Sequence, residues 1–213
     1  LCYQLPALIR QGLVVVISPL VALMQDQVQQ LNRRGICAVC MHAGLDPDRV
    51  KETLKNDRLR LLYLAPERLQ GSVTRKFIAS KAAHKEIIAF AIDEAHCISA
   101  WGHDFRPDYR RLGDLRLLYP EIPMLALTAT AAPQVRADII HLLNLRKPIL
   151  QVCSAKRNNL VYSMRRRSKE PLRNVLEILR KSRGAALIYA RTRRSVERWA
   201  QALQDAGLSA IPY

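Results

Sequence analysis

Short apolar runs alternate with stretches of helical spacing along most of the chain. The runs predict strands at residues 13–18, 36–41, 59–65, 87–93, 124–129 and 149–153. Between them, residues 20–34 repeat apolar side chains at helical spacing, and residues 133–143 form a second such stretch that opens with a proline. Alternating strands and helices are typical of βαβ units. The pattern therefore predicts an α/β fold, a mostly parallel sheet with helices on both faces.

The alternation stops at residues 154–169, which are polar and basic, with one short strand expected at 160–164. It then resumes with a helix at 172–183, a strand at 185–190, a helix at 194–206 and a strand at 208–213. We therefore predict a first lobe at 1–155, a basic connection at 156–170 and the start of a second lobe at 171–213.

The second region repeats the first at an offset of 172 residues, so that Leu203 matches Leu31 and Gly207 matches Gly35. Two similar lobes in tandem would explain this repeat. The alternative is that βαβ units in general share the pattern.

Charge adds information about the partner. The chain has a net charge of +16, and residues 154–213 carry 14 basic and 4 acidic side chains. Such an excess suits a polyanion, most simply nucleic acid, although a solvated basic face would look the same. The apolar runs stay far below the roughly 20 residues of a membrane span, so we expect no membrane partner.

The five cysteines are an odd number, and we expect them to be reduced in an intracellular, cytoplasmic protein. Cys37 and Cys40 form a lone C-x-x-C in an expected strand, where positions three apart point to opposite faces. No second pair completes a zinc site, so we interpret both as structural.

The strongest chemical signal is an apolar run that ends in Asp93 and Glu94, followed by His96. Ligands of open α/β sheets bind at the carboxyl ends of the strands. An aspartate there can hold Mg²⁺ through water beside nucleotide phosphates, and a neighbouring glutamate can act on the attacking water.

Three aromatic residues follow at a spacing of four, namely Trp101, Phe105 and Tyr109. Gly102 and Pro107 argue against a continuous helix. Aromatic rings among arginines are typical of a surface on which single-stranded bases stack, and a packed loop is the alternative.

Hydroxyl side chains end two other expected strands, at Ser18 and at Thr128 and Thr130. Such a turn can bind a neighbouring carboxylate or a phosphate. Taken alone, each is more simply the cap of the helix that follows.

Together these segments resemble the RecQ family of superfamily-2 DNA helicases, over nearly the whole chain. Residues 18–27 look like its motif Ia, 93–96 like motif II, 127–131 like motif III and 187–193 like motif IV. Residues 101–107 look like its aromatic-rich loop, which is the most family-specific part, and residues 63–68 form a family-like turn.

The resemblance implies an ATP-dependent 3′→5′ DNA helicase of two RecA-like lobes that acts in DNA repair and recombination, in a bacterium at the nucleoid. Asp93 would hold Mg²⁺, Glu94 would act as the base, and His96 would couple the ATP site to Thr128 and Thr130. The residues implied for contact with single-stranded or partly duplex DNA are Ser18, Trp101, His103, Phe105, Arg106, Tyr109 and Arg191.

Parts of the family pattern are not in the sequence. By the resemblance, the phosphate-binding loop would precede Leu1, while motifs V and VI and a zinc-binding region would follow Tyr213. Residues 154–160 lack the acidic residue and proline usual in the family. We therefore expect a truncated lobe at each end, and a chain that by itself hydrolyses ATP poorly.

Two alternatives remain open at this point. An RNA helicase of the DEAH type shares motif II, and a nucleic-acid-binding module could have lost its ATPase. The presence of Asp93, Glu94, His96, Thr128 and Thr130 argues mildly against the second.

Overall fold

A computed structural model describes all residues except 43, 46–51, 53, 155–157, 165, 167 and 183. The chain divides into two compact units, Leu1–Gln151 and Val152–Tyr213, and each is described by itself. The predicted boundaries after residues 155 and 170, and the assignment of the parts as lobes, stay predictions. In the described part of the chain, no helix is long and apolar enough to cross a membrane.

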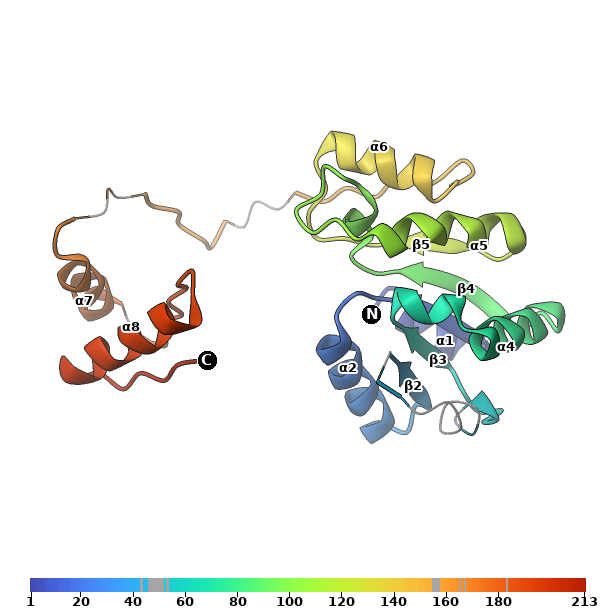
Figure 1. The fold of residues 1–213 in the computed structure, drawn as a ribbon, viewed down its shortest axis with the longest axis horizontal. Coiled ribbons are helices and arrows are strands. Elements are labelled where there is room, and N and C mark those ends of the chain that lie inside the picture. The colour runs from blue at the N-terminus through green and yellow to red at the C-terminus, as the bar shows by residue number, and fades with distance from the viewer. Residues whose placement is uncertain are drawn as a thin grey trace. The chain divides into compact units, whose positions relative to one another are not determined.

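The first unit is built on a five-stranded sheet in the order β2-β3-β1-β4-β5 (Figure 1). Every pairing between neighbouring strands is parallel. The strands are β1 Leu13–Ile17, β2 Ala38–Met41, β3 Leu61–Leu64, β4 Ile87–Ile92 and β5 Met124–Ala126. The predicted parallel α/β fold is therefore confirmed for this unit.

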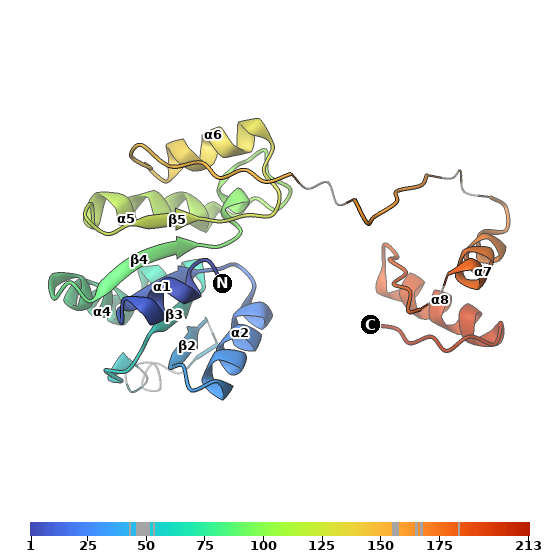
Figure 2. The same cartoon turned by 180° about the vertical axis from the view of Figure 1, so that it is seen from behind.

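Helices cover both faces of the sheet, as the two opposite views show (Figure 2). Among the described residues of this unit, the helices are α1 Gln4–Ile9, α2 Val21–Arg33, α4 Ser72–Ala83, α5 Gly113–Leu118 and α6 Pro133–Leu142. The described residues also form the 3-10 helices η1 Pro66–Gln70, η2 Ala95–Ile98 and η3 Pro107–Leu112.

The central strand β1 explains why both faces are covered. Its five residues are all buried, and alternate side chains enter two separate apolar clusters. Val15 packs with residues of α4, α5 and α6, whereas Val14 and Val16 pack with residues of α1 and α2. A strand buried on both faces must be apolar at every position, which is why β1 and β4 are continuous apolar runs.

In the described residues of the second unit, the helices are α7 Pro171–Lys181 and α8 Arg193–Asp205. Thr192 caps α8, because its side-chain oxygen accepts a hydrogen bond from the Ser195 N–H at 3.2 Å. Both helices lie within two residues of their predicted bounds.

Four predicted strands are wrong in the structure, at 149–153, 160–164, 185–190 and 208–213, since their described residues form no strand. A strand exists only where a neighbouring strand pairs with it, and these segments have no such partner among the described residues. The alternating apolar pattern is real, but Leu187 and Tyr189 are 85% and 91% exposed.

Candidate functional site

The predicted chemical residues gather at the edge of the sheet where the parallel strands end. From β1 the chain moves outward to β2 and returns to β3, and then it crosses to β4 on the other side of β1. In open α/β sheets, ligands bind at the carboxyl ends of the strands where the strand order changes direction, which here is between β1 and β4. Ser18 follows β1 and Asp93 follows β4, and the Ser18 hydroxyl donates to Asp93 Oδ2 at 3.2 Å.

Asp93 is held on its backbone as well. Its N–H donates to the Ile17 carbonyl oxygen at 2.8 Å, and its own carbonyl oxygen accepts from the Tyr109 hydroxyl at 3.0 Å. The half-buried Asp93 carboxylate is therefore fixed in place before any ligand binds.

Ser18 was predicted to contact DNA. Its hydroxyl is instead found against Asp93, and the residue is buried. The DNA contact of Ser18 stays a prediction.

Tyr109 was also predicted to contact DNA, and its burial does not fit that prediction. The residue is 0% exposed and packs in the apolar cluster beneath Asp93. Burial raises the pKa of its hydroxyl far above the ordinary value, so the group remains a hydrogen-bond donor. We correct the role of Tyr109 from a DNA contact to a residue that positions Asp93, because a ring without exposed surface cannot stack on a base.

Glu94 adopts a left-handed backbone conformation, with φ 46° and ψ 45°. Residues other than glycine, asparagine and aspartate rarely take this conformation, and strain of this kind concentrates at functional sites. The turn brings Glu94 Oε2 to 3.2 Å from His96 Nδ1. Glu94 is half-buried and directly follows Asp93 in the sequence.

His96 connects this turn to the segment after β5. Its Nδ1 lies 2.8 Å from the Thr128 hydroxyl oxygen. That hydroxyl donates to the Thr130 carbonyl oxygen at 3.2 Å, so its oxygen accepts from His96 and we assign the ring proton to Nδ1. The structure thus brings together His96, Thr128 and Thr130, the three residues predicted to couple the sites.

The pH dependence of stability tests the environment of His96. Burial above all, and the neighbouring His103, lower the pKa of His96, while Glu94 and Asp104 oppose the shift. Below the ordinary histidine pKa of about 6.5 the unfolded chain therefore binds the proton more readily, and the folded state loses stability as the pH falls. We expect the free energy of unfolding to decrease by at most about 1.4 kcal/mol per pH unit from this group.

Urea titrations of the wild type and of His96→Asn from about pH 7.5 to pH 5 measure this difference. The variant should show a shallower decline than the wild type. Parallel curves would mean that His96 titrates alike in the folded and unfolded chain.

The aromatic-rich segment that follows η2 faces solvent. Trp101 is 75% exposed and Phe105 is 37% exposed, and the Arg110 guanidinium lies 5.0 Å from the centre of the Phe105 ring. An exposed tryptophan and a phenylalanine beside an arginine offer π-faces and a positive charge in one place. Trp101 and Phe105 are thus accessible, as a stacking surface requires, and their contact with DNA stays a prediction.

Two contacts tie this exposed segment to the residues beneath it. The His103 ring stacks on the His96 ring, with centres 4.1 Å apart. Arg106 Nη1 donates to the Pro19 carbonyl oxygen at 3.0 Å, and its Nη2 donates to Asp104 Oδ2 at 2.9 Å. A movement of this segment would therefore displace the His103 ring that stacks on His96 and the Arg106 side chain that donates to the Pro19 carbonyl oxygen after β1.

The family is decided by comparison with known sequences. The sequence profile described as "DEAD/DEAH box helicase" matches residues 1–139, which include the whole of this edge of the sheet. The chain belongs to the DEAD/DEAH box helicase family.

Individual relatives show which members of this helicase family the chain is similar to in sequence. The chain is 41% identical to "ATP-dependent DNA helicase RecQ" of Pasteurella multocida, over 100% of the chain and 34% of that protein. It is 38% identical to "ATP-dependent helicase SGS1" of Saccharomyces cerevisiae, over 100% of the chain and 15% of that protein. The resemblance to RecQ helicases is thereby confirmed, and the chain spans about a third of the length of its bacterial RecQ relatives.

A solved structure supports the fold of this DEAD/DEAH helicase chain. The crystal structure of the DUF1998 helicase MrfA aligns with a TM-score of 0.70 at 22% identity, over 97% of the chain and 34% of that protein. This likeness shows the shared fold of helicase cores.

The edge of the sheet around Asp93 is suited to a divalent cation held by few protein ligands. No group of three or more His, Cys, Asp or Glu side chains gathers around one point among the described residues. Mg²⁺ is bound in many nucleotide enzymes by one or two carboxylates plus water and substrate phosphates. The fixed Asp93 carboxylate, which already accepts one hydrogen bond from Ser18, fits that requirement.

Sequence reasoning missed a polar cluster close to Asp93. The amide oxygen of Gln27 on α2 accepts hydrogen bonds from the hydroxyls of Tyr3 and Tyr63, each at 3.0 Å. Gln4, at the start of α1, donates to the Tyr63 hydroxyl oxygen at 3.1 Å. Gln27 lay in the segment that resembles motif Ia and Tyr63 in the family-like turn at 63–68, but no spacing in the sequence links these four residues.

Some predicted positions lie elsewhere in the helicase chain. Arg191 is an exposed residue of the second unit, just before α8, and its DNA contact stays a prediction. The basic residues Lys156, Arg157, Arg165 and Arg167 of the predicted connection lie outside the described residues.

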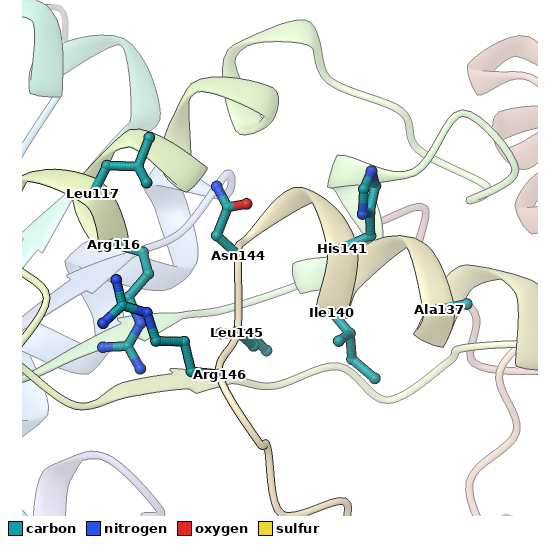
Figure 3. A pocket seen from close by; sticks show the side chains of 8 residues that line it. All are labelled: Arg116, Leu117, Ala137, Ile140, His141, Asn144, Leu145 and Arg146. Carbon is teal, nitrogen blue, oxygen red and sulfur yellow. The ribbon is translucent and has the colours of Figure 1, made fainter.

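A shallow groove of about 660 Å³ lies between α5 and α6 (Figure 3). It is lined by Arg116 and Leu117 of α5, by residues of α6, and by Asn144, Leu145 and Arg146 after it. Arg116 donates to the carbonyl oxygens of Pro120 and Ile122, so it fixes the loop that leads to β5. Since α6 starts near Thr130 and runs back along the sheet, its C-terminal end lies at the edge opposite to Asp93.

Proposed function

We propose that the chain is the central part of an ATP-dependent DNA helicase of the RecQ type, which couples ATP hydrolysis to translocation along single-stranded DNA and to unwinding. The observation that carries the proposal is the stack of His103 on His96. It joins an exposed aromatic surface to a histidine that contacts both Glu94 and Thr128. The names of the relatives favour ATP and DNA as the two ligands.

The roles follow from the positions. Mg²⁺, held by Asp93 through water, would supply charge neutralisation at the nucleotide phosphates. Glu94 accepts a proton from the attacking water, and the turn at φ 46° holds its carboxylate for that purpose. Trp101, Phe105 and Arg106 bind single-stranded DNA, and their displacement reaches His96 through His103.

Hydrolysis by the full-length gene product tests this proposal. We expect the rate to rise at least about tenfold with single-stranded DNA, and Trp101→Ala to lose most of that rise because stacking contributes about 1–3 kcal/mol per base. Matched RNA should stimulate less. Stimulation by RNA alone would assign the chain to the RNA helicases, and tight binding without hydrolysis would make it a binding module.

The direction and biological role are part of the same proposal. We propose 3′→5′ movement and a role in DNA repair and recombination, as the RecQ resemblance implies, inside the cell and away from membranes. Unwinding of duplexes that carry a 3′ or a 5′ single-stranded overhang measures the direction. Preference for the 5′ overhang would mean that the protein moves in the 5′→3′ direction instead.

Binding to single strands should depend on salt. The net charge of +16 makes phosphate contacts the main source of affinity. Each phosphate contact contributes a slope of about −0.7 to log affinity against log salt for single strands. Fluorescence anisotropy of a labelled oligonucleotide with the 213-residue chain measures that slope. A slope of zero would contradict the proposed binding, and Arg106→Ala should make the slope shallower than that of the wild type.

A further inference from the structure

The buried hydroxyl of Ser99 lies between two groups that no motif connects. It donates to Asp138 Oδ2 at 2.5 Å and accepts from the Trp101 backbone N–H at 3.1 Å. Ser99 is 0% exposed. A serine hydroxyl has a single proton to donate. Here it donates that proton to the Asp138 carboxylate, while its oxygen accepts a hydrogen bond from the Trp101 backbone N–H.

The turn around Ser99 is tightly built. The Ser99 N–H donates to the His96 carbonyl oxygen at 3.2 Å, and the Gly102 N–H donates to the Ser99 carbonyl oxygen at 3.0 Å. A Cβ on Gly102 would come within 2.4 Å of the His96 carbonyl oxygen. The backbone from His96 to Gly102 therefore has little room to rearrange while Ser99 stays in place.

Asp138 brings the helix α6 to this turn. Val135 and Ile139 of α6 are buried in the same cluster as Cys97 and Ile98 of η2. At its start, α6 is joined to the segment after Thr130, because Arg136 Nη1 donates to the Ala131 carbonyl oxygen at 2.9 Å. One rigid helix thus contacts both the segment of Thr128 and Thr130 and the turn that carries Trp101.

The exposure of Trp101 makes its backbone support important. Little of the surrounding protein packs on a side chain that is 75% exposed, so its direction depends on the backbone that bears it. Hydrogen bonds in which one partner is ionised are roughly twice as strong as neutral ones. The bond from Ser99 to the Asp138 carboxylate is of this strong kind, and it fixes the oxygen that receives the Trp101 amide.

We infer that Ser99 and Asp138 are positioning residues that hold Trp101 in its DNA-binding geometry and set the response of ATP hydrolysis to single-stranded DNA. This inference rests on the proposed function. Neither residue touches substrate. Loss of the Ser99 hydroxyl frees the Trp101 amide and leaves the Asp138 carboxylate without this donor.

The first experiment needs no DNA. The sequence has two tryptophans, Trp101 and Trp199, so Trp199→Phe leaves Trp101 as the single tryptophan fluorophore of the 213-residue chain. In that background, Ser99→Ala and Asp138→Asn should lower the steady-state anisotropy of Trp101 and raise its quenching by acrylamide. Asp114→Asn, an exposed aspartate on α5, is the matched control and should change neither.

The second experiment measures hydrolysis by the full-length gene product as single-stranded DNA is titrated. Ser99→Ala and Asp138→Asn should raise the DNA concentration for half-maximal stimulation about tenfold, which corresponds to about 1.4 kcal/mol. The rate without DNA should stay within about twofold, which corresponds to about 0.4 kcal/mol. The double variant should be no worse than the more severely affected single variant, because both remove one shared interaction.

The outcomes separate the two proposals. If single-stranded DNA does not raise the ATP hydrolysis rate of the wild type, the proposed function is wrong, regardless of the Trp101 anisotropy. If the wild type responds to DNA and Ser99→Ala has the same Trp101 anisotropy and the same half-maximal DNA concentration, the inference is wrong. Additive effects of Ser99→Ala and Asp138→Asn would also overturn it. If Ser99→Ala does not fold, the near-isosteric Asp138→Asn decides alone.

Discussion

A full-length protein with Glu94→Gln should bind ATP and single-stranded DNA but hydrolyse ATP at least about 100-fold more slowly than the wild type, since a positioned general base contributes about 10²–10⁴-fold. Glutamine keeps the size of the side chain, and its amide oxygen can take the place of Glu94 Oε2 beside His96 Nδ1. It cannot take a proton from water. The same left-handed backbone conformation serves both residues equally, so the fold should be unaffected.

Steady-state phosphate release at saturating single-stranded DNA gives the rate, and binding of a fluorescent ATP analogue shows that the site is intact. Glu121→Gln removes an exposed carboxylate outside the site and is the matched control. A Glu94→Gln protein that kept more than about a tenth of the wild-type rate would show that another group takes the proton.

Tyr109→Ala should destabilise the chain by about 3–5 kcal/mol, the range for truncation of a large buried aromatic residue. The substitution leaves a cavity in the apolar cluster and removes the hydroxyl that holds the Asp93 carbonyl oxygen. Trp101→Ala, by contrast, should change stability by no more than about 0.5 kcal/mol, because its ring is exposed. Urea unfolding of the 213-residue chain, followed by circular dichroism, measures both.

Tyr109→Phe separates the ring from the hydroxyl. This substitution should lower the free energy of unfolding by about 1 kcal/mol, which is the usual contribution of one hydrogen bond. Equal effects of Tyr109→Ala and Trp101→Ala would contradict the division of the aromatic segment into a buried anchor and an exposed surface. A stable Tyr109→Ala protein that bound DNA less tightly would restore the original prediction for Tyr109.

The strands of the first unit could be predicted because a parallel strand buried on both faces must be apolar at every position. The runs that became β1, β3 and β4 carry that signal, and each was placed within three residues of its observed bounds. The position of Asp93 and Glu94 at the carboxyl edge followed from the same signal, because both come directly after β4.

Which aromatic side chains of residues 101–109 are exposed and which are buried could not be predicted in the same way. Trp101, Phe105 and Tyr109 share a spacing of four, yet the first is exposed and the last is buried. Their environments depend on the 3-10 helix η3, which begins at Pro107 and turns Tyr109 under Asp93. A three-dimensional turn, and not a sequence period, decides which ring meets solvent.

Contacts between residues that are far apart in the sequence could not be predicted either. Ser99 and Asp138 are 39 residues apart, and Ser18 and Asp93 are 75 residues apart. Serine and aspartate are common surface residues, so neither type signals a partner by itself. The strands expected in the second unit failed for a related reason, because a strand requires a neighbour and the local pattern says nothing about whether one is present.

The left-handed backbone at Glu94 has a consequence for the evolution of the protein. A glycine there would adopt the same turn without the steric penalty of a side chain, which is roughly 1 kcal/mol. Selection for heat resistance alone would therefore favour a change that removes the carboxylate. With the proposed role of Glu94 as the base, a screen for stable variants and a screen for active ones would select different residues at position 94.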